Sequence, residues 1–466
     1  MLLKKIFDPF VKERPICVMA RAVLERLLNA ERINALFQRV AERQYTRELL
    51  FSQLAELMSE VTLGLQPAVH AAYQTRKDEL GVSATALYNK LDRVETAVSA
   101  ELVRDSFREA EPVIKALGSS HPCWLPGYRT LVLDGNALAA TEHRIDDLRT
   151  TWAAPLPGRA LVVLNQQRML VQDVFLTEDG HAQERSLLSL VLKVMEPGDL
   201  WIADRNFCTL GFLFGIVNRG AFFLIRQHGN VVGRLIGRRK YCGKTKTGKV
   251  YEQRLALTDP ETGEERTFRR ITVELYEATR DGDMVLHLLT NLPEEDASAI
   301  QVAELYRERW TIETAFFEIT TTLACEVNTL GYPKASLFAF CLALLAYNAV
   351  AVIKAALRRV HGAQTVNDEV SAYYLSLEIE RAYDGMMVSI PAVHWQVFRD
   401  MSPKEFAVFL RTVAEHVNLA RYQKHPRGPK KKPVRRTAYR NGSHVSTARI
   451  LAERKKRKTK PKKKPC

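Results

Sequence analysis

Residues 306–313 read YRERWTIE, within a segment from Ser298 to Leu323 whose apolar spacing predicts a helix. In a helix, Tyr306, Arg309 and Glu313 follow one another at intervals of three and four residues, so their side chains share one face. An apolar stripe runs beside that face and consists of Leu305, Ile312, Phe316, Ile319 and Leu323. We therefore expect one side of this helix to be buried, while a phenol, a guanidinium and a carboxylate project along its shoulder. The alternative is that Arg309 and Glu313 form an ordinary surface ion pair, worth about 0.2–0.5 kcal/mol.

The sequence upstream of this helix predicts an α/β domain. Apolar runs predict strands and helices, with turns between them, in the order Thr130–Asp134, Arg159–Leu164 and Met169–Leu176 (strands), Glu184–Met195 (helix), Asp199–Asp204 (strand), Thr209–Asn218 (helix) and Ala221–Arg226 (strand). Three strands followed by helix, strand, helix and strand is the order of a ribonuclease H-like fold, in which a mixed sheet is flanked by helices.

Residues 229–283 interrupt that order and predict a β-rich insertion. It opens with a basic loop, GRRKYCGKTKTGK at residues 237–249, and continues with strands at Val250–Thr258 and Thr267–Tyr276. Basic residues such as Lys244 and Lys246 alternate there with tyrosines, a composition that suits a surface along a phosphate backbone. The alternative is a solvated hairpin. Residues 284–289 then predict a strand that returns to the core.

Three acidic residues end or project from core elements of this domain. Asp134 and Asp204 each close a predicted buried strand, and Glu313 lies on the helix after the insertion. Three carboxylates on adjacent elements can converge on two divalent cations, which prefer oxygen ligands and can activate water for attack on phosphorus. Taken singly, an aspartate at a strand end is more often a turn former or a helix cap.

The flanking regions are predicted to be helical. Residues 1–125 form a helical domain, in which Gly81, the cap Ser83 and the helix Ala84–Val94 fit a helix-turn-helix reader of DNA or an ordinary turn in a bundle. The catalytic domain then spans residues 126–358, and a helical region spans 359–420. Phe338–Ile353 is apolar but about 16 residues long and contains Asn348, so we expect a buried core helix and no membrane association.

Charge and cysteine content narrow the functional class. Residues 421–466 contain eleven Lys and eight Arg against the single acid Glu453, whereas the whole chain carries +15. This low-complexity tail predicts a mobile segment that binds a polyanion, and the alternative is a solubilising tail. The seven cysteines form no CxxC pair, which favours reduced thiols and a cytoplasmic protein.

The combination of these residues resembles the DDE transposases of the bacterial insertion-sequence-four family. That family carries the signature Y-x2-R-x3-E-x6-K, which Tyr306, Arg309 and Glu313 match in spacing. Its second aspartate is followed by arginine, as in Asp204-Arg205-Asn206-Phe207, and its first ends a strand, as Asp134 does in LVLDGN. The resemblance covers residues 128–357 and includes a β-rich insertion between the second and third acids.

The resemblance implies a mechanism, a cofactor and partners. Asp134, Asp204 and Glu313 would bind Mg²⁺, with Mn²⁺ as a substitute. Tyr306 and Arg309, together with Arg205, would contact double-stranded DNA at the terminal inverted repeats. Water would free a 3′ hydroxyl that attacks target DNA in a cut-and-paste reaction. Trp310 or another aromatic residue, from the insertion, would stack on a displaced base. Synapsis of two ends implies a homodimer, and the family implies a bacterial, nucleoid-associated protein.

One position departs from the family signature. The lysine seven residues after the glutamate is replaced by Thr320, which can meet a phosphate oxygen but brings no charge. Lys334 is a candidate to supply that contact. Two alternatives to an active transposase therefore remain, a DNA-binding derivative with impaired catalysis and a nuclease of the same fold without strand transfer.

Overall fold

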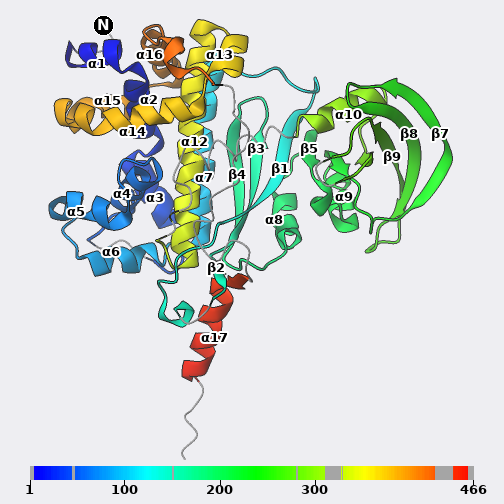
Figure 1. The fold of residues 1–466 in the computed structure, drawn as a ribbon, viewed down its shortest axis with the longest axis horizontal. Helices are drawn as coiled ribbons and strands as arrows, with labels where there is room; N and C mark the ends of the chain where they lie inside the picture. Colours follow the sequence, from blue (N-terminus) through cyan, green and yellow to red (C-terminus); the bar gives the residue numbers. More distant parts are fainter. Residues whose placement is uncertain are drawn as a thin grey trace, which may run out of the picture.

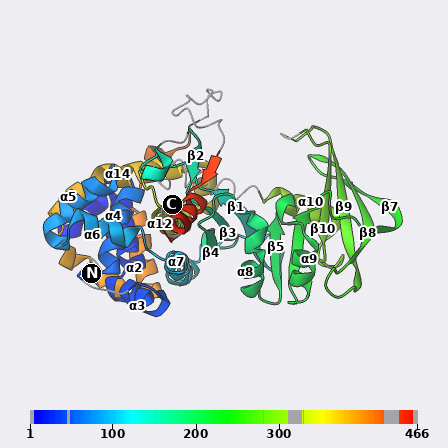
Figure 2. The same cartoon turned by 90° about the horizontal axis from the view of Figure 1, so that it is seen from below.

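A nine-stranded mixed sheet extends from the middle of the protein to one side in the computed structural model (Figure 1). The structure describes residues 5–44, 48–149, 152–279, 282–309, 327, 329–425 and 444–459. A helical bundle packs against one end of the sheet, and the other end curls into a β layer capped by a helix (Figures 1 and 2). The strand order is β4-β3-β1-β5-β6-β10-β9-β8-β7.

The first half of the sheet is consistent with a ribonuclease H-like core. Its strands are β1 (Arg129–Ala137), β3 (Arg159–Asn165), β4 (Leu170–Thr177), β5 (Asp199–Ala203) and β6 (Phe222–Arg226). β3 is antiparallel to both β1 and β4, whereas β1, β5 and β6 run parallel to one another. All five predicted strands of this half are confirmed.

The predicted insertion continues the same sheet. Its strands are β7 (Arg234–Lys244), β8 (Gly248–Thr258) and β9 (Glu265–Leu275), and β10 (Val285–Thr290) joins β9 to β6 through antiparallel pairing. The basic loop predicted at residues 237–249 is wrong for most of its length, because β7 runs to Lys244 and only residues 245–247 form a turn. Pairing with β8, including the cross-strand pair Tyr241 and Tyr251 with ring centroids 5.4 Å apart, overrides the polar composition.

A single apolar core joins the helices from both ends of the chain. The N-terminal helices are α1 (Asp8–Glu13), α2 (Pro15–Leu27), α3 (Ala30–Val40), α4 (Phe51–Thr62), α5 (Val69–Leu80), α6 (Ala84–Leu91) and α7 (Thr96–Leu117). The C-terminal helices are α12 (Pro333–His361), α13 (Ala363–Glu369), α14 (Ala372–Ser389), α15 (Val397–Asp400) and α16 (Pro403–Ala414). Their buried side chains share one cluster with β1, β3 and β4.

The helix α12 is long and apolar enough to cross a membrane, yet its most apolar window is entirely buried in the protein. α7 and α12 lie side by side against β4 (Figures 1 and 2). The prediction of a core helix is confirmed, and the helix extends beyond the predicted residues at both ends.

Asn348 is a polar side chain inside that core, and its hydrogen bonds with Val171 and Ser106 are made to buried groups. It is fully buried, its Oδ1 accepts from the Val171 amide at 2.8 Å, and its Nδ2 donates to the Val171 carbonyl at 2.9 Å and to Ser106 at 2.8 Å. Val171 lies on β4, the end strand of the sheet. One amide thus bonds backbone groups that a further strand would otherwise pair.

Short helices cover the opposite face of the sheet. α8 (Leu188–Lys193) and α9 (Leu210–Val217) bury the side chains of Leu131 and Trp201. The predicted helix at residues 184–195 is present, but it opens with a 3-10 turn, η3 (Glu184–Leu187). α10 (Ala299–Arg307) packs on the face of the sheet opposite to α8 and α9, over β5, β6 and β8 to β10. Its first turn is closed by a capping box of Ser298 and Gln301.

The predicted helix-turn-helix geometry is present in the N-terminal region. Gly81 ends α5 with φ +64, a left-handed conformation that favours glycine, and the Ser83 hydroxyl caps α6 through the Ala86 amide. Lys90 is directed inward, where its ammonium donates to the Leu49 carbonyl and lies 5.3 Å from the Phe37 ring centroid. Asn89 and Arg93 are exposed. DNA reading by this element stays a prediction.

Part of the C-terminal tail is folded, in contrast to the mobile tail that its composition predicts. β11 (His444–Ser446) pairs in parallel with β2 (Ala154–Leu156), and α17 (Thr447–Thr459) follows. Local composition gives no sign of this pairing, because the partner strand lies far away in the sequence. The remaining tail residues, 426–443 and 460–466, are outside the described residues.

Candidate active site

The register of the two central strands brings Asp134 and Asp204 together. Leu133 of β1 pairs with Ala203 of β5, so the two aspartates come next on parallel neighbours, which lie about 4.8 Å apart in a sheet. Side chains alternate along a strand, and Val132 and Ile202, two residues earlier, lie on the face that carries α12 and α10. Both carboxylates are therefore placed toward the α10 side of the sheet.

Local hydrogen bonds orient both carboxylates. Asp134 Oδ1 accepts from the Gly135 amide at 2.9 Å. Asp204 Oδ1 accepts from the Asn206 amide at 2.8 Å and caps the short helix η4 (Arg205–Phe207). The capping role that argues against Asp204 as a ligand is thus real. This hydrogen bond occupies one carboxylate oxygen of Asp204, and Asp204 still lies beside Asp134.

Tyr306 and Arg309 complete the described part of the site. Tyr306 lies in the last turn of α10 and is 7% exposed, and the Arg309 guanidinium lies 5.8 Å from its ring centroid. Arg309 Nη1 is 3.7 Å from Asp134 Oδ2. Burial raises the pKa of Tyr306 to about 12; Arg309 and Arg226 act against that rise, and the charge of Asp204 adds to it.

The helical position predicted for Arg309 is wrong. α10 ends at Arg307, the Glu308 amide bonds to the carbonyls of both Glu304 and Leu305, and the Arg309 amide bonds only three residues back to Tyr306, which tightens the chain into a turn. Arg309 nevertheless contacts Tyr306, so the pair comes together by another route. Glu313, Trp310 and Thr320 lie outside the described residues, as does the rest of the predicted helix to Leu323.

The described residues supply part of a metal site. Asp134 and Asp204 offer the hard oxygen ligands that Mg²⁺ prefers. Within the described ranges, no group of three or more His, Cys, Asp or Glu side chains is arranged to hold a metal ion. The two aspartates therefore fit a site that takes its further ligand from elsewhere, and Glu313 is the predicted source.

The structure adds an acid that the sequence does not single out. A β carbon on Gly135 would lie 2.4 Å from the Glu184 carboxyl carbon, so that carboxylate sits directly against the residue after Asp134. Arg159 Nη1 lies 3.4 Å from Glu184 Oε1. Burial raises the pKa of Glu184, the Arg159 charge lowers it, and the Asp204 charge raises it further. The glycine after Asp134 is the only trace of this contact in the sequence.

A cationic group lies at the ends of β5 and β6. Arg226 donates to Asp283 Oδ2 at 2.6 Å, and Arg205 Nη1 is 3.7 Å from the same oxygen. Arg205, a predicted DNA contact, is partly exposed and shares the Asp283 carboxylate with Arg226. The sequence does not single out Arg226. Arg226 is the last residue of the apolar strand β6 and belongs to no motif.

The turn after β7 is near Tyr306. Lys246 and Tyr306 both line a cavity of about 520 Å³ between α10 and the strands β9 and β10. Gly243, with φ +129, packs on Ile300 of α10, because a β carbon there would lie 2.8 Å from the Ile300 Cδ1. Lys244 is exposed at the end of β7. Of the two predicted lysines, the structure places Lys246 beside the site.

Comparison with known families agrees with this geometry. Residues 125–349, a little under half of the chain, match the family described as Transposase DDE domain. The match spans all three predicted acids together with Tyr306 and Arg309, and it implies transposase activity and DNA binding. A search of curated protein sequences finds no match to the chain.

Proposed function

We propose that this protein is a cut-and-paste DNA transposase of the insertion-sequence-four type. It binds the ends of its own element, cleaves them by metal-dependent hydrolysis and joins the 3′ hydroxyls to target DNA. The observation that supports this most strongly is the pairing of Leu133 with Ala203, which sets Asp134 and Asp204 side by side near Tyr306 and Arg309.

In this proposal Asp134, Asp204 and Glu313 hold Mg²⁺. The metal would supply charge stabilisation at phosphorus and lower the pKa of the attacking water or hydroxyl. The protein groups position the substrate. Arg309, which lies by Asp134 in the structure, turns its fixed fork of donors to a phosphate beside the cut. Tyr306 keeps its proton, because burial raises its pKa, and so can donate to a phosphate oxygen.

The remaining DNA contacts are assigned by position. Arg205 and Lys246 lie close to the site, Lys244 extends the basic surface along β7, and Trp310 stacks on a displaced base. The N-terminal helix-turn-helix reads the terminal repeats, two copies form the synaptic complex, and the protein acts in the bacterial cytoplasm.

The test is a reaction of the full chain with its element's terminal repeats, Mg²⁺ and a target plasmid. Joined products are expected, and Asp134→Asn, Asp204→Asn and Glu313→Gln should each reduce them by about 10³-fold, because metal charge stabilisation is worth several kcal/mol. Asp146→Asn is a matched control, since Asp146 is 72% exposed and outside the site.

The alternatives give different products. Binding of the repeats without cleavage would overturn the proposal in favour of a catalytically impaired derivative, and Thr320→Lys would then be the first variant to restore cleavage. Cleavage without joining would indicate a nuclease of the same fold.

A further inference from the structure

The folded part of the basic tail returns to the edge of the domain at which β1 ends, close to the candidate active site. β11 pairs with β2 through His444 with Ala154 and Ser446 with Leu156. Ser446, the last residue of β11, and Thr447, the first residue of α17, are buried, with 2% and 0% exposure. The start of α17 is thus fixed by backbone pairing and burial.

The position of β2 relates this docking point to the catalytic strands. β2 leads directly into β3, whose first residue, Arg159, pairs with Ala137 three residues beyond Asp134 on β1. The same Arg159 contacts Glu184 and donates to the Gly180 carbonyl at 2.9 Å. α17 therefore emerges from the edge of the domain at which β1 ends, and it projects away from the body of the protein (Figure 1).

Two ion pairs set the direction of α17. Arg449 Nε lies 2.7 Å from Asp179, next to Gly180, and Arg454 Nη1 lies 2.8 Å from Asp147. Each exposed pair stabilises little by itself. Combined with the β11–β2 pairing, they tie the helix to the domain at points five residues apart.

Three further basic residues lie at the outer end of α17. The side chains of Lys455, Lys456 and Arg457 are exposed, and three consecutive residues spread around more than half of the helix circumference. At 1.5 Å per residue the helix is about 20 Å long, which matches about six phosphate steps of 3.4 Å along one DNA strand. The outer end has no apolar face, so a duplex backbone suits it better than a lipid surface.

We infer that α17 is a docked arm that binds the phosphates of duplex DNA beside the active site, with its direction set by the β11–β2 pairing. This inference rests on the proposed function for the identity of the nucleic acid. This inference differs from non-specific electrostatic attraction of DNA by the whole basic tail, because it requires the DNA-binding charges to lie on the docked helix α17.

A matched pair of triple variants of the full chain tests the location of the charge. One variant carries Lys455→Gln, Lys456→Gln and Arg457→Gln, and the other carries Lys462→Gln, Lys463→Gln and Lys464→Gln, which removes equal charge close by. The measurement is affinity for a terminal-repeat duplex over a series of salt concentrations. We expect the first variant to lose about tenfold in affinity and to flatten the salt slope by up to about 2.7, since each phosphate contact contributes about 0.9. The second should change little. Equal effects of both variants, or no effect of the first, would overturn the docked arm.

A second variant tests the docking itself. Asp147→Asn with Asp179→Asn releases both ion pairs and raises the net charge by two, so attraction by charge alone predicts tighter DNA binding. The docked arm predicts weaker binding and a shorter protected region in a DNA footprint. Unchanged thermal unfolding would show that the variant is folded, and tighter binding with an unchanged footprint would overturn the inference. Because these measurements need no catalysis, their failure is distinct from failure of the Asp134, Asp204 and Glu313 variants to lose joining.

Discussion

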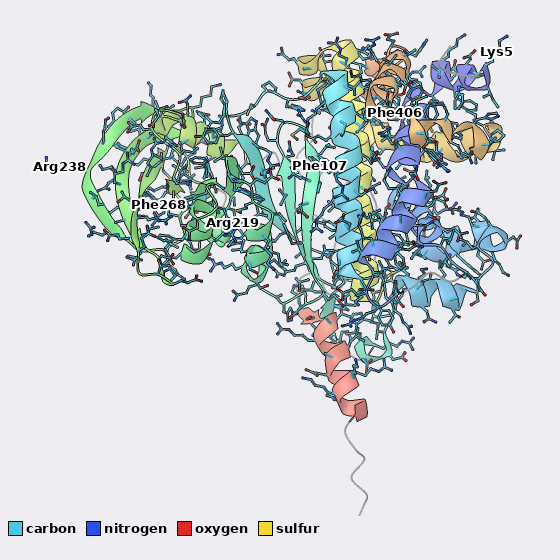
Figure 3. All side chains as sticks on the ribbon, turned by 180° about the vertical axis from the view of Figure 1, so that it is seen from behind. Lys5, Phe107, Arg219, Arg238, Phe268 and Phe406 are labelled. Carbon is cyan, nitrogen blue, oxygen red and sulfur yellow. The ribbon has the colours of Figure 1, made fainter. Side chains whose placement is uncertain are left out.

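The two ends of the nine-stranded sheet are protected in opposite ways. At the β4 end, α7 and α12 cover the strand, and Asn348 bonds the backbone of Val171 inside an apolar core. At the β7 end, the last strand is exposed and carries Arg238, Arg239 and Lys240, with Arg238 on the outer rim of the curved sheet (Figure 3). An end strand invites pairing with other chains, and either burial or charge prevents it.

The two halves of the sheet are also held together in different ways. The covered half is held by apolar packing from both ends of the chain. The open half combines apolar packing with a buried charge, because Arg269, 2% exposed, binds Glu252 and donates to the carbonyls of Leu292, Pro293 and Ala297. These carbonyls immediately precede α10, so Arg269 also fixes the position of the start of the helix that leads to Tyr306 and Arg309.

The largest effect is expected from Arg269→Met. The change leaves Glu252 and three carbonyls without their donor, and removing one partner of a buried ion pair costs about 3–5 kcal/mol. Urea unfolding measures the loss. Arg234→Met is the control, since Arg234 pairs with Glu265 at the exposed edge and should cost about 1 kcal/mol or less. Equal losses in the two variants would contradict a special role for buried charge in the open half.

Asn348→Leu tests the covered edge. The leucine fits an apolar helix but leaves the amide and carbonyl of Val171 unsatisfied, at about 1–3 kcal/mol for each buried group. We expect a loss of about 3 kcal/mol in unfolding free energy, measured by denaturation. Asn89→Leu on the exposed face of α6 should be nearly neutral. A neutral Asn348→Leu would mean that packing alone protects β4.

Gly135→Ala tests the site between the two halves. The new methyl group displaces the Glu184 carboxylate, which is the end of a flexible side chain, so the unfolding free energy should change by less than about 1 kcal/mol. Joining of terminal repeats should fall about tenfold, a barrier change of about 1.4 kcal/mol, if that carboxylate orders the surroundings of Asp134. Gly211→Ala is the control, because a β carbon there meets nothing within 4 Å. Full activity of Gly135→Ala would remove Glu184 from consideration.

Neutralising the open edge should have a smaller effect on DNA binding. Arg238→Gln with Lys240→Gln removes two exposed charges from β7, and we expect a few-fold loss of duplex affinity at about 0.15 M salt with a flatter salt slope. Lys12→Gln with Arg14→Gln removes the same charge from the helical end of the protein. If both pairs lower affinity alike, the open edge is not a DNA surface.

The smallest effect concerns acid sensitivity of the open half. Burial lowers the pKa of His287 to about 4, and the charges of Arg270, Arg239 and Arg226 add to the shift. The native protein thus binds fewer protons than the unfolded chain between pH 6.5 and 4, and stability is lost as the pH falls through that range. His287→Gln should flatten this loss by about 1 kcal/mol or less, because the half-exposed ring is screened by solvent. An unchanged pH profile would assign the acid sensitivity to other groups.

Much of the fold was predictable because apolar runs and caps are local signals. The strands around Asp134 and Asp204, the buried helix with Asn348 and the start of α10 at Ser298 follow from periodicity and capping. β7 was not predictable, since its basic residues become a strand only through pairing with β8. β2 and β11 are three residues long and separated by almost the whole catalytic region, so neither shows a pattern of its own.

The site was predictable to the same degree. Spacing identifies Tyr306 and Arg309, the ends of predicted strands identify the two aspartates, and the structure brings these four together. Glu184 and Arg226 reach the site from separate elements, so only the fold reveals them. The roles of Glu313 as a metal ligand and Trp310 as a DNA contact stay predictions, as does the effect of Thr320 in place of the family lysine.

The shared helical core has a consequence for how the chain folds. α12 packs against α2, α4 and α7, and Asn348 reaches Ser106 across 242 residues of sequence. Contacts between residues so far apart in the sequence form late, and proteins that depend on them fold slowly. A nascent chain on the ribosome therefore holds its N-terminal helices without their central partner until residues beyond 361 have been made. Fragments that stop before α12 are expected to expose apolar surface and to be degraded, so an interrupted copy of the gene would yield no competing DNA-binding protein.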